Sequence, residues 1–164
     1  MGNIDIYCGN GRGKTTLAIG KGIQASTQEK SVIIIQFLKG KERKELDFLE
    51  NMETRDIKVF RFEKMDACYE DLTQEEKEEE NINILNGVNF ARKVVVTQEC
   101  DFLILDEVLG LLDTGIISID VLTEILKQRN DSMDIIMTGR ECPEELKEFA
   151  DTITELTTIY TREP

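Results

Sequence analysis

Residues 8–16, with the sequence Cys-Gly-Asn-Gly-Arg-Gly-Lys-Thr-Thr, combine the residue types that bind a phosphate chain. Glycines let a loop curl so that its backbone N–H groups point at phosphate oxygens, and a helix that follows adds the partial positive charge of its N-terminus. Lys14 would supply a mobile cation for the distal phosphates, and the Thr15 hydroxyl would supply a ligand for Mg²⁺. The pattern therefore predicts a loop that binds a nucleoside triphosphate.

The loop departs from the usual motif at one position. The common spacing has a glycine five positions before the glycine that precedes the lysine, and here that position is Cys8. An ordinary glycine-rich turn is the alternative reading. That turn would need neither the lysine nor the two threonines, which stand here between a strand-like run and a helix-like run, so nucleotide binding is favoured.

Two carboxylates follow an apolar run later in the chain. The run Phe102–Leu105 leads directly into Asp106 and Glu107. An acid at the carboxyl end of a buried strand can reach the Mg²⁺ that lies beside a loop lysine. Such a run is a weak signal alone, because apolar strands often end in acids. Together with the glycine-rich loop it predicts that both acids take part in a metal site.

Cationic residues occur at two further places where a ligand would use them. Arg140 follows the apolar run that ends in Thr138, and it could pair with a phosphate or with Glu141 or Glu144 at the surface. The spacing leaves both readings open. Four more cations cluster after another apolar run, as an anion-facing patch or as a solvated loop: Lys39, Lys41, Arg43 and Lys44.

The sequence contains no histidine. A Ser-His-Asp or Cys-His triad, a histidine base and an imidazole metal ligand are therefore excluded. Chemistry in this chain must depend on a bound metal ion, on lysine, arginine and carboxylate groups, and on the positioning of the reactants.

Apolar, β-branched runs alternate with helical patterns, which is the arrangement of a parallel sheet with helices on its faces. We expect helices over residues 14–25, 42–52, 73–98, 120–128 and 143–150. In the first of them, Leu17 and residues 20–23 are expected to pack on the sheet. The expected strands are Ile4–Tyr7, Val32–Phe37, Ile57–Phe62, Phe102–Leu105, Ile135–Thr138 and Thr152–Ile159.

Residues 70–80 are the most acidic stretch of the chain. Thr73 and Glu76 form a capping-box pattern, so we interpret the stretch as the solvated N-terminus of a helix rather than as a disordered tail. The apolar residues behind it recur at spacings of four, three and four, which indicates the inward face of that helix: Ile84, Val88, Ala91 and Val95.

The composition fits a single nucleotide-binding domain over residues 1–164 that stays in the cytoplasm. With 40% hydrophobic and 32% charged residues, the chain can bury a core of its own. It has neither an apolar run long enough for a membrane span nor a secretory leader, and its net charge of −13 disfavours a nucleic-acid partner. The four cysteines have no zinc or disulfide spacing, which indicates reduced thiols, most of them buried.

Four segments, in order and over nearly the whole chain, resemble the ATP:corrinoid adenosyltransferases of the P-loop type. They are GNGRGKTT (9–16), QFLKG (36–40), LILDE (103–107) and TGRECPEELKEFADTITEL (138–156). The family's loop reads GNGKGKTT and also lacks the usual first glycine, so the exception at Cys8 agrees with the resemblance. The resemblance implies an α/β, RecA-like P-loop NTPase fold with a mainly parallel six-stranded sheet, in a homodimer.

The resemblance also implies a reaction. The 5′-deoxyadenosyl group of ATP would pass to the Co(I) form of a corrinoid, with release of triphosphate. ATP would lie reversed in the loop, so that its C5′ carbon faces the acceptor. The reduced cobalt would itself be the nucleophile, which leaves alignment and charge neutralisation to the protein. A reductase that supplies the reduced corrinoid is an implied partner.

Roles for individual residues follow from the matched positions. Lys14 and Glu107 are the expected catalytic residues, and Thr15, with Asp106 or Glu107, would hold Mg²⁺. The residues implied to bind ATP include two from the family's QFIKG segment, and the set is Gly9, Asn10, Gly11, Arg12, Gly13, Lys14, Thr15, Thr16, Gln36, Lys39 and Arg140.

The acceptor side differs from the family pattern. Family members carry a glycine-aromatic segment with a tryptophan that helps to displace the lower axial ligand of the corrinoid. The corresponding residues here, 62–69, include no tryptophan, and Phe62 and Tyr69 are the candidates for its role. Two other functions stay open: an ATP-binding relative that regulates or interacts without transferring adenosyl, and a small P-loop ATPase or nucleotide kinase.

Overall fold

The computed structural model describes residues 1–38, 47–48, 51 and 56–162. Six strands in these residues form one sheet in the order β3-β2-β4-β5-β1-β6, and every pairing is parallel. This confirms the predicted α/β class and its parallel six-stranded sheet. The strands are β1 (Ile4–Cys8), β2 (Val32–Gln36), β3 (Ile57–Arg61), β4 (Phe102–Asp106), β5 (Asp134–Thr138) and β6 (Thr152–Glu155).

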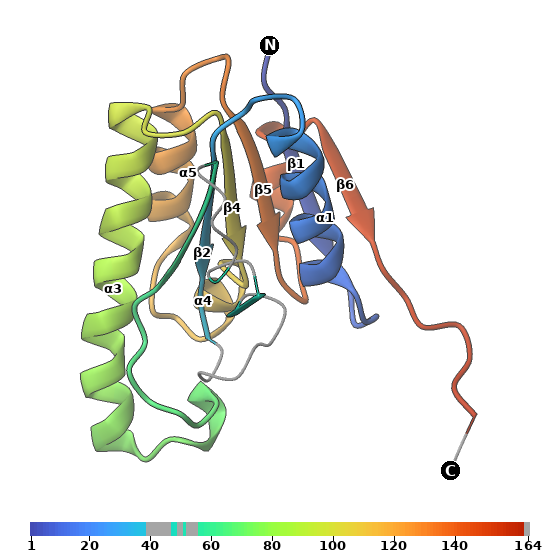
Figure 1. Ribbon diagram of the computed structural model, residues 1–164. Helices are drawn as coiled ribbons and strands as arrows, with labels where there is room; N and C mark the ends of the chain where they lie inside the picture. The colour runs from blue at the N-terminus through green and yellow to red at the C-terminus, as the bar shows by residue number, and fades with distance from the viewer. Residues whose placement is uncertain (39–46, 49–50, 52–55, 163–164) are drawn as a thin grey trace.

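Helices cover both faces of the sheet (Figure 1). The long helix α3 (Gln74–Thr97) lies with α5 (Ile119–Lys127) and the short α4 (Gly110–Asp113) on one face, and α1 (Lys14–Ser26) lies on the other. Alternate strand residues enter each layer. The central strands β2 and β4 are buried along their whole length, because both of their faces are covered.

The carboxyl ends of the strands meet at one edge of the sheet, since all six run in the same direction. Strands β1, β2, β4 and β5 end there at Cys8, Gln36, Asp106 and Thr138. The register places Gln36 beside Asp106, and Tyr7 beside Thr138. This edge therefore brings together the ends of the predicted motifs.

Helix α1 begins at Lys14 as expected. Of the residues expected to pack on the sheet, Gly22 is buried, but Leu17 and Ile23 are 37% and 43% exposed, so the expectation is wrong for these two. Small residues let the helix approach closely: a Cβ on Gly22 would lie 3.0 Å from Ile104 Cδ1. The buried face consists of Thr15, Ala18, Ile19, Gly22 and Ala25.

Two expected elements after residue 140 are shorter in the structure. Strand β6 ends at Glu155 instead of Ile159, and residues 156–162 form neither helix nor strand. A 3₁₀ helix, η2 (Glu144–Glu148), replaces the α-helix expected over residues 143–150. The reason is the early return to the sheet, because the N–H of Asp151 already bonds to the Ile4 carbonyl. The helix expected over residues 42–52 lies largely outside the described residues.

The capping box at the start of α3 is confirmed. Thr73 Oγ1 accepts a hydrogen bond from the Glu76 N–H, and the Glu76 carboxylate accepts one from the Thr73 N–H. The predicted inward stripe is also confirmed, since Ile84, Val88, Ala91 and Val95 are all at most 4% exposed. Sequence and structure therefore agree on where this helix begins and which face it buries.

Glu80 does not fit the prediction of a solvated acidic helix end. Its side chain is only 1% exposed. The carboxylate accepts hydrogen bonds from the N–H groups of Lys64 and Met65 and from the Asn83 amide. Glu80 thus connects α3 to the segment after β3 by hydrogen bonds. The sequence did not indicate this role, because Glu80 stands in a run of acidic residues.

The four cysteines are free thiols, as expected. Only two of them, Cys8 and Cys100, are buried, so the expectation that most are buried is wrong: Cys142 is half-buried and Cys68 is exposed. Among the described residues, no helix has the length and apolar character that a membrane span requires.

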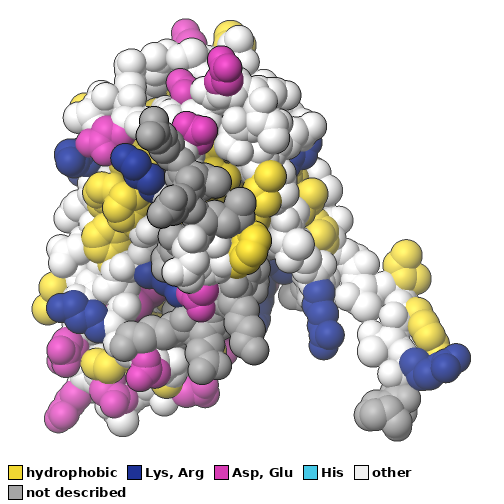
Figure 2. Space-filling view, viewed as in Figure 1, with side chains coloured by type: hydrophobic (Ala, Val, Ile, Leu, Met, Phe, Trp, Pro, Cys, Tyr) yellow, Lys and Arg dark blue, Asp and Glu magenta, His cyan; other side chains and the backbone are white. Residues whose placement is uncertain are grey.

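The C-terminal end of the described chain stands away from the rest of the molecule (Figures 1 and 2). Hydrophobic side chains lie near its tip in the space-filling view. Ile159 and Tyr160 are 97% and 77% exposed. The isolated chain therefore leaves two large apolar side chains in water.

Candidate functional site

The loop between β1 and α1 has a conformation that explains its alternating glycines. Gly9 and Gly13 have φ angles of 102° and 100°, which residues with a Cβ rarely adopt. A Cβ on Gly9 or on Gly11 would lie 2.4 or 2.5 Å from the carbonyl oxygen of Leu156. The glycines are therefore required because the chain just after β6 runs directly against the loop.

Main-chain hydrogen bonds hold the loop on two sides. The N–H of Gly9 donates to the Arg140 carbonyl and the N–H of Gly11 donates to the Leu156 carbonyl, each over 2.8 Å. These two amides are engaged within the protein, so the two glycines shape the loop. The first helical bond of α1 runs from Leu17 to the Gly13 carbonyl, and the N–H groups before it form the anion-binding end of the helix.

Lys14 closes the loop from inside. Its Nζ donates to the carbonyl oxygens of Gly9 and Gly11, over 2.6 and 2.9 Å. No described atom lies within 4 Å of the position that a Cβ on Gly13 would take, so the loop is open on that side. A cation next to an open, glycine-lined hollow is the arrangement that a phosphate group needs. Three further predicted residues lie exposed around it: Asn10, Arg12 and Thr16.

Asp106 is the centre of a buried polar cluster at the end of β4. The residue is 1% exposed and accepts three hydrogen bonds. Its Oδ1 accepts from Thr15 Oγ1 over 2.8 Å and from Thr138 Oγ1 over 2.7 Å, and its Oδ2 accepts from Gln36 Nε2 over 3.1 Å. The cluster joins α1, β2, β4 and β5 and places Thr15 against Asp106, two of the predicted metal ligands.

Glu107 and Gln36 complete the polar edge. Glu107 has a φ angle of 60°, and its N–H donates to Thr138 Oγ1 over 2.8 Å. The buried Oε1 of Gln36 has no hydrogen-bond partner within the described part of the chain, which costs about 1–3 kcal/mol. A metal-bound water or a ligand hydroxyl could donate to it. Thr15 and Asp106 bond to each other through a hydroxyl and a carboxylate, and Glu107 adds a second carboxylate at the next position of the chain. These are the hard oxygen donors that Mg²⁺ prefers, so the residue types fit that ion.

An open cavity of about 350 Å³ adjoins this edge. Tyr69, Arg140 and Glu107 line it together with Leu38 and Cys68. Tyr69 comes from the 3₁₀ helix η1 (Tyr69–Asp71), and its hydroxyl donates to Asn81 Oδ1 over 2.7 Å. The cavity is thus lined both by the segment after β3, which includes Tyr69, and by Glu107, the residue after β4.

Of the two aromatic candidates, the structure brings only Tyr69 to the cavity. Phe62 packs instead against Phe90 of α3, with ring centroids 5.5 Å apart. It also lies over Gly87, where a Cβ would be 3.0 Å from its ring. Phe62 is therefore a partly buried residue that packs against the core.

Arg140 is exposed at the mouth of the cavity, and within the described residues its side chain makes no ion pair. Glu144, one of its expected alternative partners, pairs instead with Lys147 over 2.7 Å. Burial and the charge of Glu141 raise the pKa of the nearby Asp113 carboxyl, and the charge of Arg140 opposes them. The guanidinium is thus available to a ligand.

Several site features were not predicted. From the sequence Thr138 is only the end of a strand, although its hydroxyl links Asp106 to the Glu107 N–H. Leu38 is an apolar residue of the QFLKG segment with no mark of a site residue, and nothing in the sequence indicates the contact of Leu156 with the loop. Lys39, like the rest of the cationic cluster at Lys41, Arg43 and Lys44, lies outside the described residues.

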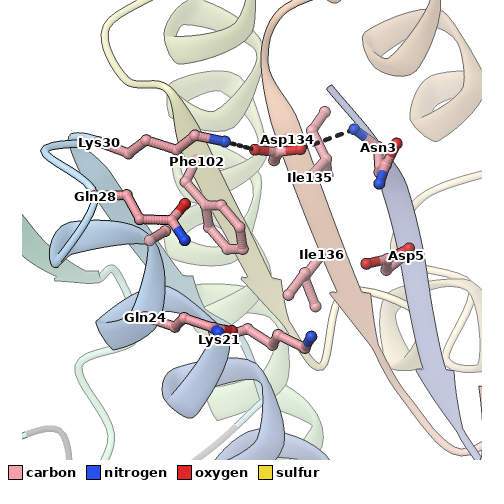
Figure 3. A pocket seen from close by; sticks show the side chains of 11 residues that line it. Asn3, Asp5, Lys21, Gln24, Gln28, Lys30, Phe102, Asp134, Ile135 and Ile136 are labelled. Atoms are coloured by element: carbon pink, nitrogen blue, oxygen red, sulfur yellow. Dashed lines mark hydrogen bonds and ion pairs between the residues drawn. The ribbon is translucent and has the colours of Figure 1, made fainter. Parts of the chain in front are cut away.

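A second hollow, of about 210 Å³, lies at the other end of the sheet between α1 and the starts of β1, β4 and β5 (Figure 3). Asp134 in this hollow accepts a hydrogen bond from the Asn3 N–H over 2.8 Å, and it forms an ion pair with Lys30 over 2.6 Å. None of the predicted site residues lies there.

Comparison with known proteins agrees with this geometry. Residues 1–162 match the family described as ATP:corrinoid adenosyltransferase BtuR/CobO/CobP. The chain is 28% identical over 156 residues to the corrinoid adenosyltransferase of Escherichia coli strain K12, a match that covers 94% of this chain and 76% of that protein. It is 27% identical over 156 residues to the corrinoid adenosyltransferase CobA of Salmonella typhimurium, with the same coverage.

A further relative is the uncharacterized protein all2391 of a Nostoc species, which is 28% identical over 177 residues. That match covers 97% of this chain and 44% of the Nostoc protein. The family match extends over all four segments on which the resemblance was based. The chain belongs to the ATP:corrinoid adenosyltransferase family.

Proposed function

We propose that the chain transfers the 5′-deoxyadenosyl group of ATP to the Co(I) centre of a corrinoid and releases triphosphate. The observation that carries this proposal is the meeting of three features at one sheet edge: the loop around Lys14, the cluster around Asp106, and the cavity lined by Tyr69 and Arg140. Membership of the family supports both substrates. Glu107 lies between the polar cluster and the cavity, where donor and acceptor meet.

The reaction requires no proton transfer. The electron pair of Co(I) forms a bond to C5′ while the C5′–O5′ bond breaks. The pair of the broken bond leaves with triphosphate, and cobalt becomes formally Co(III). A chain without histidine can perform this reaction because the substrate itself is the nucleophile. Aligning C5′ with the cobalt and neutralising the leaving group are the tasks of the protein.

The residues of the site divide these tasks. Lys14 Nζ, which bonds to the loop carbonyls in the free protein, bonds to phosphate oxygens when ATP is bound. The N–H groups at the N-terminus of α1 bond to the same phosphates. Arg140 reaches the nucleotide as a bidentate donor. Thr15, Asp106 and Glu107 hold Mg²⁺, which when bound supplies positive charge against the leaving triphosphate. ATP lies reversed in the loop, so that C5′ faces the cavity.

We also propose that the protein works as a homodimer of single nucleotide-binding domains, with a reductase that supplies the reduced corrinoid. Apolar side chains exposed on α1 and after β6 support a second copy: Leu17, Ile23, Ile159 and Tyr160. Sedimentation velocity should give a dimer for the wild-type chain and a shift towards monomer for Leu17→Glu. A wild-type monomer at micromolar concentration would contradict this part of the proposal.

The test of function is anaerobic incubation of the protein with ATP, Mg²⁺ and a chemically reduced corrinoid. We expect a light-sensitive cobalt–carbon product together with inorganic triphosphate in equal amount. Lys14→Ala serves as the control, because it removes the cation of the loop while the corrinoid cavity stays intact.

The other outcomes of this experiment discriminate between the alternatives. Release of ADP and phosphate, with no organocobalt product, would show a P-loop ATPase or kinase. If neither product forms but ATP still raises the melting temperature, the chain is an ATP-binding module. Either outcome would overturn adenosyl transfer.

A further inference from the structure

A buried carboxyl group beside the cavity has no part in the chemistry described so far. Glu63 follows β3, and its Oε1 accepts a hydrogen bond of 2.5 Å from the backbone N–H of Leu38. Its Oε2 is buried and has no hydrogen-bond partner within the described residues. An unpartnered buried oxygen is costly. The hydrogen bond to the Leu38 N–H is therefore the stabilising contact that this side chain makes.

Leu38 holds an unusual place in the cavity wall. Its φ angle is 58°, in the left-handed region that residues other than glycine rarely occupy. Its Cδ1 lies 2.6 Å from the position that a Cβ on Gly110 would take, so its side chain covers that glycine. Leu38, Gly110 and Glu107 line the same cavity. A strained backbone at such a point persists only if its surroundings hold it there.

The surroundings of Glu63, above all its burial, favour a proton on its carboxylate. Burial raises its pKa to about 7; the Leu38 N–H and Arg61 of β3 oppose that rise, and the charge of Glu80 on α3 adds to it. Glu80 is itself fully enclosed, at 1% exposure. The cavity between these two carboxyl groups has a volume of only about 10 Å³, no more than one water needs. Solvent therefore gives Glu63 little relief when it ionises.

We propose that Glu63 is a positioning residue for the acceptor: it holds Leu38 in its left-handed conformation and so fixes the cavity wall beside Glu107. The inference rests on the proposed function, which identifies the acceptor as a corrinoid. Glu63 acts through Leu38 on the cavity and not through the loop that holds Lys14. Its removal should therefore weaken acceptor binding and leave ATP binding unchanged.

Two substitutions of similar length separate this role from a general effect on folding. Glu63→Met removes the acceptor of the Leu38 N–H, whereas Glu63→Gln keeps an amide oxygen in its place. For Glu63→Met we expect the KM for the corrinoid to rise about tenfold, as loss of one hydrogen bond to a charged or strong acceptor implies. Glu63→Gln should stay within about twofold of the wild type. The ATP affinity should not change in either variant.

A matched control and a coupled pair complete the kinetic test. Glu79→Met changes an exposed acid of α3 and should leave both substrates unaffected. Leu38→Ala should raise the KM for the corrinoid by itself. In that background, Glu63→Met should add little, because residues that act through one another are not additive. Additive effects on KM would overturn the proposed route through Leu38.

A measurement on the wild-type protein needs no variant and no activity. In NMR spectra the Leu38 amide should titrate with a midpoint near the Glu63 pKa of about 7. Since this pKa lies above the ordinary 4.5, the folded state binds the proton more tightly. The free energy of unfolding should therefore fall as the pH rises from about 4.5 to about 7 and stay level above it. Glu63→Gln should remove that slope.

The results distinguish failure of this inference from failure of the proposed function. A wild-type protein that transfers no adenosyl group contradicts the function. A wild-type protein that is active, with an unchanged KM for the corrinoid in Glu63→Met, contradicts only the role of Glu63. A Leu38 amide that does not titrate between pH 6 and pH 8 also overturns it, even if Glu63→Met fails to fold.

Discussion

The two ends of the sheet each carry a hollow with polar and charged walls, and they differ in how those groups are paired. At the amino end, Asp134 is satisfied by Lys30 and by the Asn3 N–H (Figure 3). At the carboxyl end, the buried Gln36 Oε1 has no partner and Arg140 makes no ion pair within the described residues. Polar groups that bond to one another stabilise the fold, whereas a buried polar group without a partner is available to bond to a ligand. The difference between Asp134, which is paired, and Gln36 Oε1, which is not, is therefore the contrast between the two hollows.

The largest expected effect comes from one lysine at each end. Lys14→Ala should weaken ATP binding about 100-fold, because it removes a cation that makes charge-assisted hydrogen bonds. Lys30→Ala, at the amino end, should leave the ATP affinity within twofold and lower the melting temperature slightly. Isothermal titration with ATP and Mg²⁺ measures both. Equal losses of affinity in the two variants would break the comparison.

Two aspartates form the next pair. Asp106→Asn should reduce the Mg²⁺-dependent part of ATP binding about tenfold, since it removes a charged oxygen from the metal site. Asp134→Asn should instead cost stability, because the ion pair with Lys30 and its bond to the Asn3 N–H weaken. ATP titrations with and without Mg²⁺, beside thermal melts, separate the effects. A Mg²⁺ dependence that survives Asp106→Asn would remove Asp106 from the metal site.

Two glycines test how tightly the loop is held. Gly11→Ala should destabilise the protein by about 1–3 kcal/mol and weaken ATP binding, because its Cβ would collide with the Leu156 carbonyl. Gly20→Ala on α1 has open space around its Cβ and should stabilise the helix by about 0.5–1 kcal/mol. Urea denaturation curves measure both. A neutral Gly11→Ala would mean that the contact with Leu156 does not hold in solution.

The smallest effect concerns the thiols. Cys68 lines the cavity proposed for the corrinoid and is exposed, whereas burial raises the pKa of Cys100 to about 12. We expect Cys68 to react first with a thiol reagent and Cys100 to react only on unfolding. Corrinoid, but not ATP alone, should slow the reaction of Cys68 several-fold. A rate that ATP alone reduces as much would place the nucleotide in the cavity.

The sequence predicted the elements and the motifs that depend on local patterns. The parallel direction of the strands follows from the alternation of buried runs with helices, and the start of α3 follows from Thr73 and Glu76. Asp106 and Glu107 are predicted to share a metal site with the loop because an acid at the carboxyl end of a buried strand can reach the Mg²⁺ beside the loop lysine. These features depend on near neighbours in the chain or on rules that all parallel sheets obey.

Features that depend on distant contacts escaped prediction. Glu80 reads as one more acid in a charged stretch, yet the segment at Lys64 and Met65 folds over it. The buried face of α1 was only partly chosen from spacing: Gly22 was expected to pack on the sheet, but the buried Ala18 and Ile19 were not. Likewise, η2 replaced a helix only because Asp151 must reach β1. Each case was decided by a partner far away in sequence.

The place of β1 in the sheet has a consequence for synthesis. Its two neighbours are β5 and β6, and the glycine-rich loop is held by the carbonyls of Arg140 and Leu156. The ribosome makes the loop well before it makes β5 and β6, at roughly 5–20 residues per second, so the loop amides of Gly9 and Gly11 wait for these two partners. If the loop binds ATP as proposed, we expect a chain that lacks β5 and β6 to bind it more weakly than the whole chain. In the proposed function, ATP binding would thus report that β5 and β6 have paired with β1.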